Sequence, residues 1–165
     1  MARQILERDM AMRLARLIAL GTPLALLTGA YISQYGFGLV PCEMCWWQRY
    51  GHFAALALAI LANLAVRQIW LTGLAAVAIA AAGLIGLFHA GVEYHWWQGL
   101  TACSTTVGAV GGDPLEAIMN APLVRCDVAP WSLWGISLAG WNFLFSLASA
   151  IAIGFLLMRR KAVSG

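Results

Sequence analysis

Long apolar blocks without acidic or basic side chains dominate this chain. Residues 17–42, 68–91 and 128–158 contain no Asp, Glu, Lys or Arg, and residues 46–66 contain one Arg. A helix needs about 20 largely apolar residues to cross the hydrocarbon core of a bilayer. The blocks therefore predict an all-α membrane protein, a bundle of four transmembrane helices, with spans at about 17–33, 46–66, 68–91 and 134–158.

The composition supports a single integral membrane domain over residues 1–165. Hydrophobic residues make up 62% of the chain and charged residues 10%, whereas a soluble domain normally carries about 25% charged residues. Gly and Ala are frequent in the last three blocks, which favours close packing of helices in lipid. The net charge of +3 is small and the basic residues flank apolar blocks. We therefore expect the lipid bilayer as a partner, and no nucleic acid.

The distribution of Lys and Arg predicts the orientation of the spans. Eight of the ten lie before the first block, between the second and third, or after the fourth: Arg3, Arg8, Arg13, Arg16, Arg67, Arg159, Arg160 and Lys161. The other two are Arg49 and Arg125. Because basic flanks stay on the cytoplasmic side, both termini are predicted to be cytoplasmic. Loops 35–45 and 92–130 then face outward.

Two short amphipathic helices are expected outside the spans. Residues 3–13 mix apolar and charged side chains and predict a helix on the membrane surface. The apolar stretch that follows is longer than a usual signal-peptide core and has no small-x-small site before Tyr31, so we expect a retained span. In the second outer loop, Asp113, Pro114 and Glu116 form an N-terminal capping pattern. This pattern predicts a short amphipathic helix that rests on the membrane surface and keeps Cys126 movable, with a plain packed loop helix as the alternative.

All four cysteines fall on the predicted outer side, where disulfides persist. Cys42 and Cys45 form a Cys-x-x-Cys pair at the entry to the second span, and Cys103 and Cys126 lie in the second outer loop. A thiolate at a helix N-terminus is stabilised and reactive, and Pro41 stops the helix from extending backwards. Two alternatives remain open, namely static disulfides and a zinc site. The wide spacing of the second pair disfavours zinc, so no metal is predicted.

Arg49 lies four residues after Cys45 and therefore shares a helix face with it. A charge just inside a span is costly and often functional, although an Arg that extends to the lipid headgroups is the ordinary alternative. Beside a reactive pair, an Arg stabilises a thiolate and donates hydrogen bonds to a carbonyl compound. A pair that oxidises others must itself be reoxidised. The chain has no flavin, nucleotide or haem motif, so a quinone dissolved in the bilayer is the expected acceptor.

Five stretches of the chain resemble the DsbB family of disulfide bond formation proteins. They are Pro-Cys-Glu-Met-Cys-Trp-Trp-Gln-Arg at 41–49, Gly-Val-Glu with two Trp at 91–97, Cys103, Arg-Cys-Asp at 125–127, and Trp-Gly-Ile-Ser-Leu-Ala-Gly-Trp-Asn at 134–142. A lone Cys-x-x-Cys is a weak signal. The order of the pair at the second span and two further cysteines between the third and fourth spans is specific.

The resemblance implies a thiol oxidase of the bacterial inner membrane whose active cysteines face the periplasm. A periplasmic thioredoxin-fold protein of the DsbA type would attack a Cys103–Cys126 disulfide at Cys103. Cys126 would then attack a Cys42–Cys45 disulfide at Cys42. Cys45 would leave as a thiolate beside ubiquinone or menaquinone near Arg49, and electron transport to the quinone would sustain protein disulfide bond formation.

Four further polar residues lie in or near the predicted spans. His89, His95 and Glu93 are expected to be ordinary interfacial residues, and Asn142 to form a hydrogen bond between helices.

The sequence leaves other functions open. A vitamin K epoxide reductase-like oxidase is one alternative to a DsbB-type oxidase, although in that family the Cys-x-x-Cys pair follows the loop cysteine. Others are a membrane protein with purely structural disulfides and a DsbB-like paralogue that serves one substrate.

Overall fold

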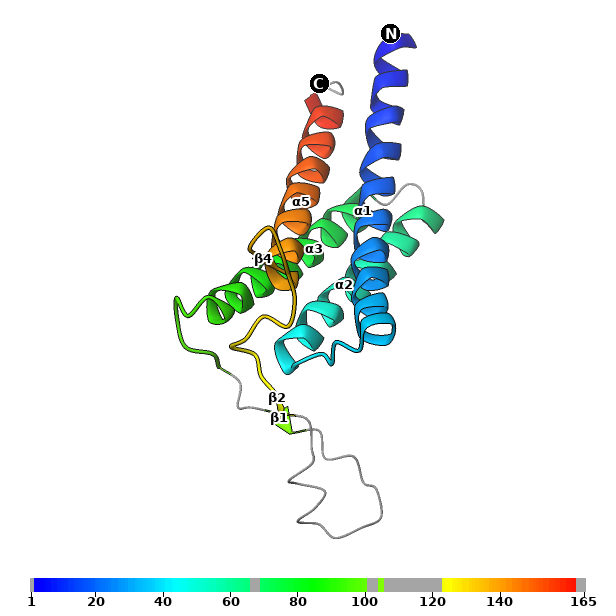
Figure 1. Cartoon of the computed structure of the whole chain (residues 1–165). Coiled ribbons are helices and arrows are strands. Elements are labelled where there is room, and N and C mark those ends of the chain that lie inside the picture. The colour runs from blue at the N-terminus through cyan, green and yellow to red at the C-terminus, as the bar shows by residue number, and fades with distance from the viewer. Residues whose placement is uncertain (1, 66–68, 101–103, 106–122, 163–165) are drawn as a thin grey trace.

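A computed structural model describes residues 2–65, 69–100, 104–105 and 123–162 (Figure 1). Two predicted features lie outside the described residues. One is Cys103, and the other is the short helix expected around Asp113 in the second outer loop. The structure therefore describes that loop only in part.

The described part of the chain is mostly helical, as predicted. Its long helices are α1 (Ala2–Phe37), α2 (Glu43–Leu64), α3 (Ile69–Glu93) and α5 (Leu138–Ala162). Two antiparallel pairs of very short strands complete it: β1 (Ser104–Thr105) with β2 (Leu123–Val124), and β3 (Ser132–Leu133) with β4 (Ile136–Ser137).

Three of these helices satisfy the requirements for a membrane span. Within the described residues, the stretches 3–37, 69–93 and 138–160 are long and apolar enough to cross a bilayer. The fourth helix, α2, has 22 residues but carries Glu43, Gln48, Arg49 and His52 in its first half. These polar groups lower its hydropathy, so its crossing of the membrane stays a prediction.

The helices pack closely through small side chains. α3 packs against α2 and α5, and α1 packs against the same two helices. Alanines at positions such as Ala55, Ala59 and Ala75 form the centre of this core. A Cβ atom added to Gly83 of α3 would lie 2.7 Å from Cβ of Ser146 on α5. Only glycine permits this approach, as expected for helices that associate in lipid.

The first helix differs from its prediction. Residues 3–13 do not form a separate surface helix, because α1 runs without a break from Ala2 to Phe37. The residues between the two predicted segments, such as Leu14, Ala15 and Arg16, are strong helix formers and contain no Gly or Pro. At about 1.5 Å per residue, α1 is longer than the hydrocarbon core is thick.

A β-hairpin precedes the last helix, where the sequence analysis placed the start of a span at Trp134. Trp134 and Gly135 adopt φ values of 52° and 77° and form the two-residue turn between β3 and β4, as in a type I′ hairpin. The hydroxyl of Tyr94 donates to the Gly135 carbonyl at 2.9 Å and accepts from the Ser137 N–H at 2.8 Å. These bonds fasten the hairpin to the end of α3, and α5 begins only at Leu138.

The two ends of the bundle carry different features. Figure 1 shows the start of α1 and the end of α5 at one end, and the α1–α2 connection towards the other. The chain bearing β2, which leads to Cys126, approaches that second end. The cysteine-bearing segments are thus separated from the basic ends of the chain along the bundle.

Candidate active site

The Cys-x-x-Cys pair forms the first turn of α2. Cys42 is the N-cap, with φ −77° and ψ 175°. Its sulfur accepts a hydrogen bond from the Cys45 backbone N–H at 3.3 Å, and its thiol donates to Cys45 Sγ at 3.0 Å. The first N–H groups of a helix lack intrahelical partners and carry partial positive charge. Negative charge on Cys45 is therefore stabilised at this position.

Of the two thiols in the pair, Cys42 is the weaker acid. The hydrogen bond to Cys45 and burial raise the pKa of Cys42 to about 12, while His89 acts in the opposite direction with a smaller effect. A thiol with this pKa stays protonated at neutral pH and is a poor nucleophile. Cys45 is the sulfur that receives its hydrogen bond.

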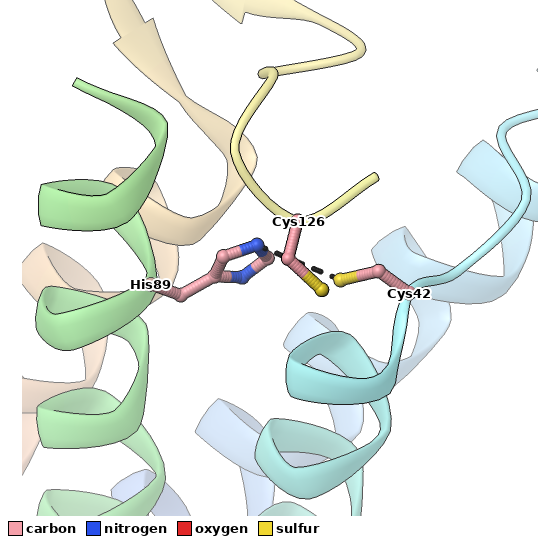
Figure 2. Close-up of side chains that lie close together, drawn as sticks. All are labelled: Cys42, His89 and Cys126. Carbon is pink, nitrogen blue, oxygen red and sulfur yellow. Dashed lines mark hydrogen bonds between the residues drawn. The ribbon is translucent and has the colours of Figure 1, made fainter. Parts of the chain in front are cut away.

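Cys126 lies beside this pair although it is far away in sequence. Cys42 Sγ, Cys126 Sγ and a ring nitrogen of His89 all lie within 4.8 Å of one another (Figure 2). Cys42 and Cys126 are both buried and pack with Met44 and Val92 in one small cluster. Beside Cys126, the Arg125 guanidinium pairs with Asp127 and lowers the pKa of that carboxyl to about 2. The segment after β2 therefore places Cys126 Sγ beside Cys42 Sγ.

His89 and Glu93 are not ordinary interfacial residues, so that expectation was wrong. His89 is 3% exposed, and its Nε2 lies 3.5 Å from Cys42 Sγ. The same nitrogen lies 3.7 Å from Oε1 of Glu93, one helical turn further along α3. The other carboxylate oxygen of Glu93 is buried without a hydrogen-bond partner among the described residues. The end of α3 therefore contributes two buried titratable groups to the site.

The position of the His89 proton bears on whether the cluster suits a metal ion. Gln48 Nε2 donates to the Met44 carbonyl at 3.1 Å and lies 2.9 Å from His89 Nδ1. An atom that donates to a carbonyl is an NH₂ group, so Nδ1 accepts and the ring proton of neutral His89 sits on Nε2. Nε2 faces the sulfurs, and a metal needs its lone pair free. The arrangement favours hydrogen-bonded thiols over metal binding at Cys42, His89 and Cys126.

Arg49 is held inside the bundle. Its side chain is 6% exposed, and it donates to Gln34 Oε1 at 2.6 Å and to the Ala30 carbonyl at 3.2 Å, both on α1. The guanidinium carbon also lies 4.8 Å and 5.0 Å from the ring centroids of Tyr31 and Trp46. These contacts hold the guanidinium between α1 and α2, so the side chain does not extend towards the lipid headgroups.

A cavity of about 240 Å³ adjoins the cysteine pair. Its walls are largely apolar and come from α1, α2, α3 and α5, with Leu138 and Phe145 among the lining residues. The polar groups that line it converge from four helices: Ser33, Cys45, Gln48, Arg49, His52, His89, Glu93 and Asn142. An apolar cavity with a few convergent polar groups is typical of a small-molecule site.

Asn142 forms the predicted hydrogen bonds between helices. It donates to Gln48 Oε1 on α2 at 2.7 Å and to the Ala82 carbonyl on α3 at 3.2 Å, and its own oxygen lies 2.7 Å from His52 Nε2. Gln48, His52 and His89 line the cavity but were not predicted as site residues from the sequence. Their position inside apolar spans was a signal that could have identified them, because polar groups are rare there and often mark functional sites.

The chain resembles known proteins over most of its length. The family model for disulfide bond formation protein DsbB matches residues 12–156. A protein of Verminephrobacter eiseniae named disulfide bond formation protein B is 33% identical, over 87% of this chain and 85% of that protein. Similarly named proteins of Acidovorax and Pseudomonas aeruginosa are 28% and 29% identical, over 89% and 83% of this chain and 87% and 88% of their own length. No solved structure gives a significant match. With its three apolar helices, the chain is a membrane protein that belongs to the DsbB family, with a role in disulfide bond formation.

Proposed function

We propose that this protein is a quinone-dependent thiol oxidase. It takes electrons from a soluble periplasmic protein of the DsbA type and passes them to ubiquinone or menaquinone. One observation carries the proposal: Cys45 and Arg49, four residues apart on α2, line the same apolar cavity at the end of the bundle. A thiolate and a cation in an apolar cavity suit an acceptor that arrives from the bilayer.

The thiol half of the reaction uses the sulfurs in series. The partner's thiolate attacks Cys103 of a Cys103–Cys126 disulfide, and the electron pair of the broken bond goes to Cys126. The Cys126 thiolate then attacks Cys42 Sγ of the Cys42–Cys45 disulfide. A Cys42–Cys126 bond forms, and the electron pair of the old bond goes to Cys45. The closeness of Cys126 and Cys42 supports this second step.

The size and lining of the cavity support the binding of a quinone head group there. Its volume of about 240 Å³ lies below the range of roughly 300–1,000 Å³ typical for larger ligands, which suits a ring without its lipid tail. A bound quinone supplies the capacity to accept two electrons and two protons. Arg49 has five N–H donors, and donors not engaged with α1 would hydrogen-bond a carbonyl oxygen. Cys45 would lie beside the same head group.

We also propose that the protein lies in a bacterial inner membrane with the cysteine end facing the periplasm. The support is the separation between the basic ends of the chain and the cysteines along the bundle. Basic flanks stay in the cytoplasm, so the opposite end, which bears Cys42 and Cys45, would face the oxidising compartment.

The proposal is tested with purified protein in detergent, a reduced DsbA-type protein and ubiquinone. We expect one quinone to be reduced for each disulfide formed, with the quinone followed by its ultraviolet absorbance and the thiols by alkylation. Cys45→Ser should abolish quinone reduction. Tyr50→Phe is the matched control, because Tyr50 is exposed on the same helix, and it should leave the rate unchanged.

Other outcomes would identify other functions. Disulfides that never exchange with the partner, with no loss of quinone, would favour the structural role and contradict the oxidase. Exchange with the partner that never reduces ubiquinone or menaquinone would contradict the quinone half of the proposal and retain the thiol half.

A further inference from the structure

One ring nitrogen at the wall of the cavity has no hydrogen-bond partner among the described residues. It is Nδ1 of His52 on α2, and the atom is buried. The residue is 3% exposed and lines the same cavity as Cys45 and Arg49. Buried polar groups are nearly always paired, and an unpaired one is costly. This nitrogen is therefore available to a molecule that occupies the cavity.

The other ring nitrogen of His52 is held by α5. Nε2 lies 2.7 Å from Oδ1 of Asn142. The amide nitrogen of Asn142 donates to the Ala82 carbonyl at 3.2 Å and to Gln48 Oε1 at 2.7 Å. A carbonyl oxygen only accepts hydrogen bonds, so the Asn142 atom beside Ala82 is the NH₂ group and the atom beside His52 is the amide oxygen. The Nε2–H group of His52 is therefore the donor in the bond to Asn142.

The tautomer of His52 follows from this bond. A neutral imidazole carries one ring proton, so a proton on Nε2 leaves Nδ1 as an acceptor with a free lone pair. Turning the ring over would place Cε1 against Asn142 Oδ1 and lose the bond. A buried charge needs a partner, and His52 forms no ion pair with any residue that the structure describes. The neutral ring therefore fits this position, with Nδ1 as an acceptor.

A group that only accepts hydrogen bonds distinguishes a quinone from its reduced form. A quinone oxygen accepts but has no proton to donate, whereas each hydroxyl of the quinol does both. Arg49 only donates, so it suits the oxygen of either form. Glu93 also lines the cavity with a buried oxygen that has no partner among the described residues, but a carboxyl group donates when protonated and accepts when ionised. Nδ1 of His52 favours the quinol alone.

We propose that Nδ1 of His52 accepts a hydrogen bond from a hydroxyl of the quinol, so that the cavity binds the quinol more tightly than the quinone. The inference rests on the proposed function and deepens it, because it concerns the product that forms beside Cys45. Tighter binding of the reduced form raises the midpoint potential of the bound quinone, by about 30 mV for each tenfold difference in affinity. His52 thereby favours electron flow from the cysteine pair to the quinone.

The first test observes the lone pair of His52 by ¹⁵N NMR of labelled histidine side chains. The chain has three histidines, and His89→Gln and His95→Asn assign the other two, so no His52 variant is needed. Decylubiquinol is added to reduced protein and decylubiquinone to oxidised protein, so that no electrons are exchanged. We expect Nδ1 to carry no proton without ligand, and its signal to shift with the quinol only. A proton on Nδ1, or equal shifts with the two ligands, would overturn the proposal.

The second test measures the dissociation constants of the same two ligands by calorimetry in detergent. His52→Gln keeps an N–H donor near the position of Nε2 for Asn142, but has no acceptor at the position of Nδ1. It should weaken quinol binding about three- to tenfold, because one hydrogen bond is lost, and leave quinone binding nearly unchanged. Phe145→Leu is the matched control. It removes apolar surface from the cavity wall and should weaken the binding of both ligands alike.

The outcomes separate this inference from the proposed function. If His52 only held Asn142 in place, His52→Gln would bind both ligands as the wild type does, and this result would refute the preference for the quinol. An equal loss of affinity for the two ligands would refute it as well, and both results leave the proposed function intact. Wild-type protein that binds neither ligand would contradict the quinone-dependent function and the inference together.

Discussion

Arg49 of α2 donates a 2.6 Å hydrogen bond to the side-chain oxygen of Gln34 on α1. The bond holds the guanidinium against the neighbouring helix, one turn from Cys45 and at the wall of the cavity. An Arg that only reached for the lipid headgroups would be oriented outward and exposed. The observed contact instead fixes a planar group of donors beside the reactive pair.

The first prediction concerns this residue. Arg49→Lys keeps the charge but loses the planar donor fork, so the KM for quinone should rise moderately. Arg49→Ala or Arg49→His should raise it by about one to two orders of magnitude, because a hydrogen bond to a charged group is worth about 1.5–3 kcal/mol. Single-turnover exchange with the partner, measured without quinone, should stay nearly normal. Unchanged quinone kinetics in these variants would show that Arg49 is not part of the quinone site.

A second prediction concerns the order of the sulfurs. Cys126→Ser removes the thiol that resolves the complex with the partner, so a mixed disulfide between Cys103 and the partner should accumulate. Non-reducing gel electrophoresis followed by peptide mapping measures it. Cys103→Ser is the comparison variant and should trap nothing. Equal trapping by the two variants would mean that the assigned roles of Cys103 and Cys126 are wrong.

The orientation in the membrane gives a third prediction. A reporter that is active only in the periplasm should work when fused after Gly112 and fail when fused at Arg67 or at Gly165. The reason is the excess of Lys and Arg at the chain ends and between the second and third helices. Fusion activity measures it directly. Periplasmic activity at Gly165 would contradict the predicted arrangement of four spans with both termini in the cytoplasm.

A fourth prediction concerns packing of the bundle. Gly83→Ala would place a Cβ 2.7 Å from Ser146 Cβ on α5, so it should destabilise the protein by about 1–3 kcal/mol through overpacking. Gly73→Ala, on the same helix with nothing within 4 Å, should not destabilise it, since Ala favours helix. Thermal unfolding in detergent compares the two. Equal unfolding temperatures would mean that α3 and α5 do not pack as described.

The sequence alone determined the features that depend on local chemistry. Uncharged blocks predicted the helical bundle, because unbroken apolar stretches of about 20 residues have the length of a helix that crosses a bilayer with all its backbone groups paired. The spacing of Cys42 and Cys45, together with Pro41, predicted a reactive pair at a helix start, where the backbone supplies the stabilising dipole. Arg49 was predicted to belong to the same site because it lies four residues after Cys45, and residues four apart share a helix face.

Only the tertiary structure decided which helix faces meet. His89 lies 47 residues from Cys42, and Gln48 lies 94 residues from Asn142. In an apolar helix such as α3, periodicity does not reveal which side faces protein and which faces lipid, since both sides are apolar. Helix rotation is set by close contacts such as that of Gly83 with Ser146. Because of that rotation His89, which was expected to be an interfacial residue, lies beside Cys42 Sγ.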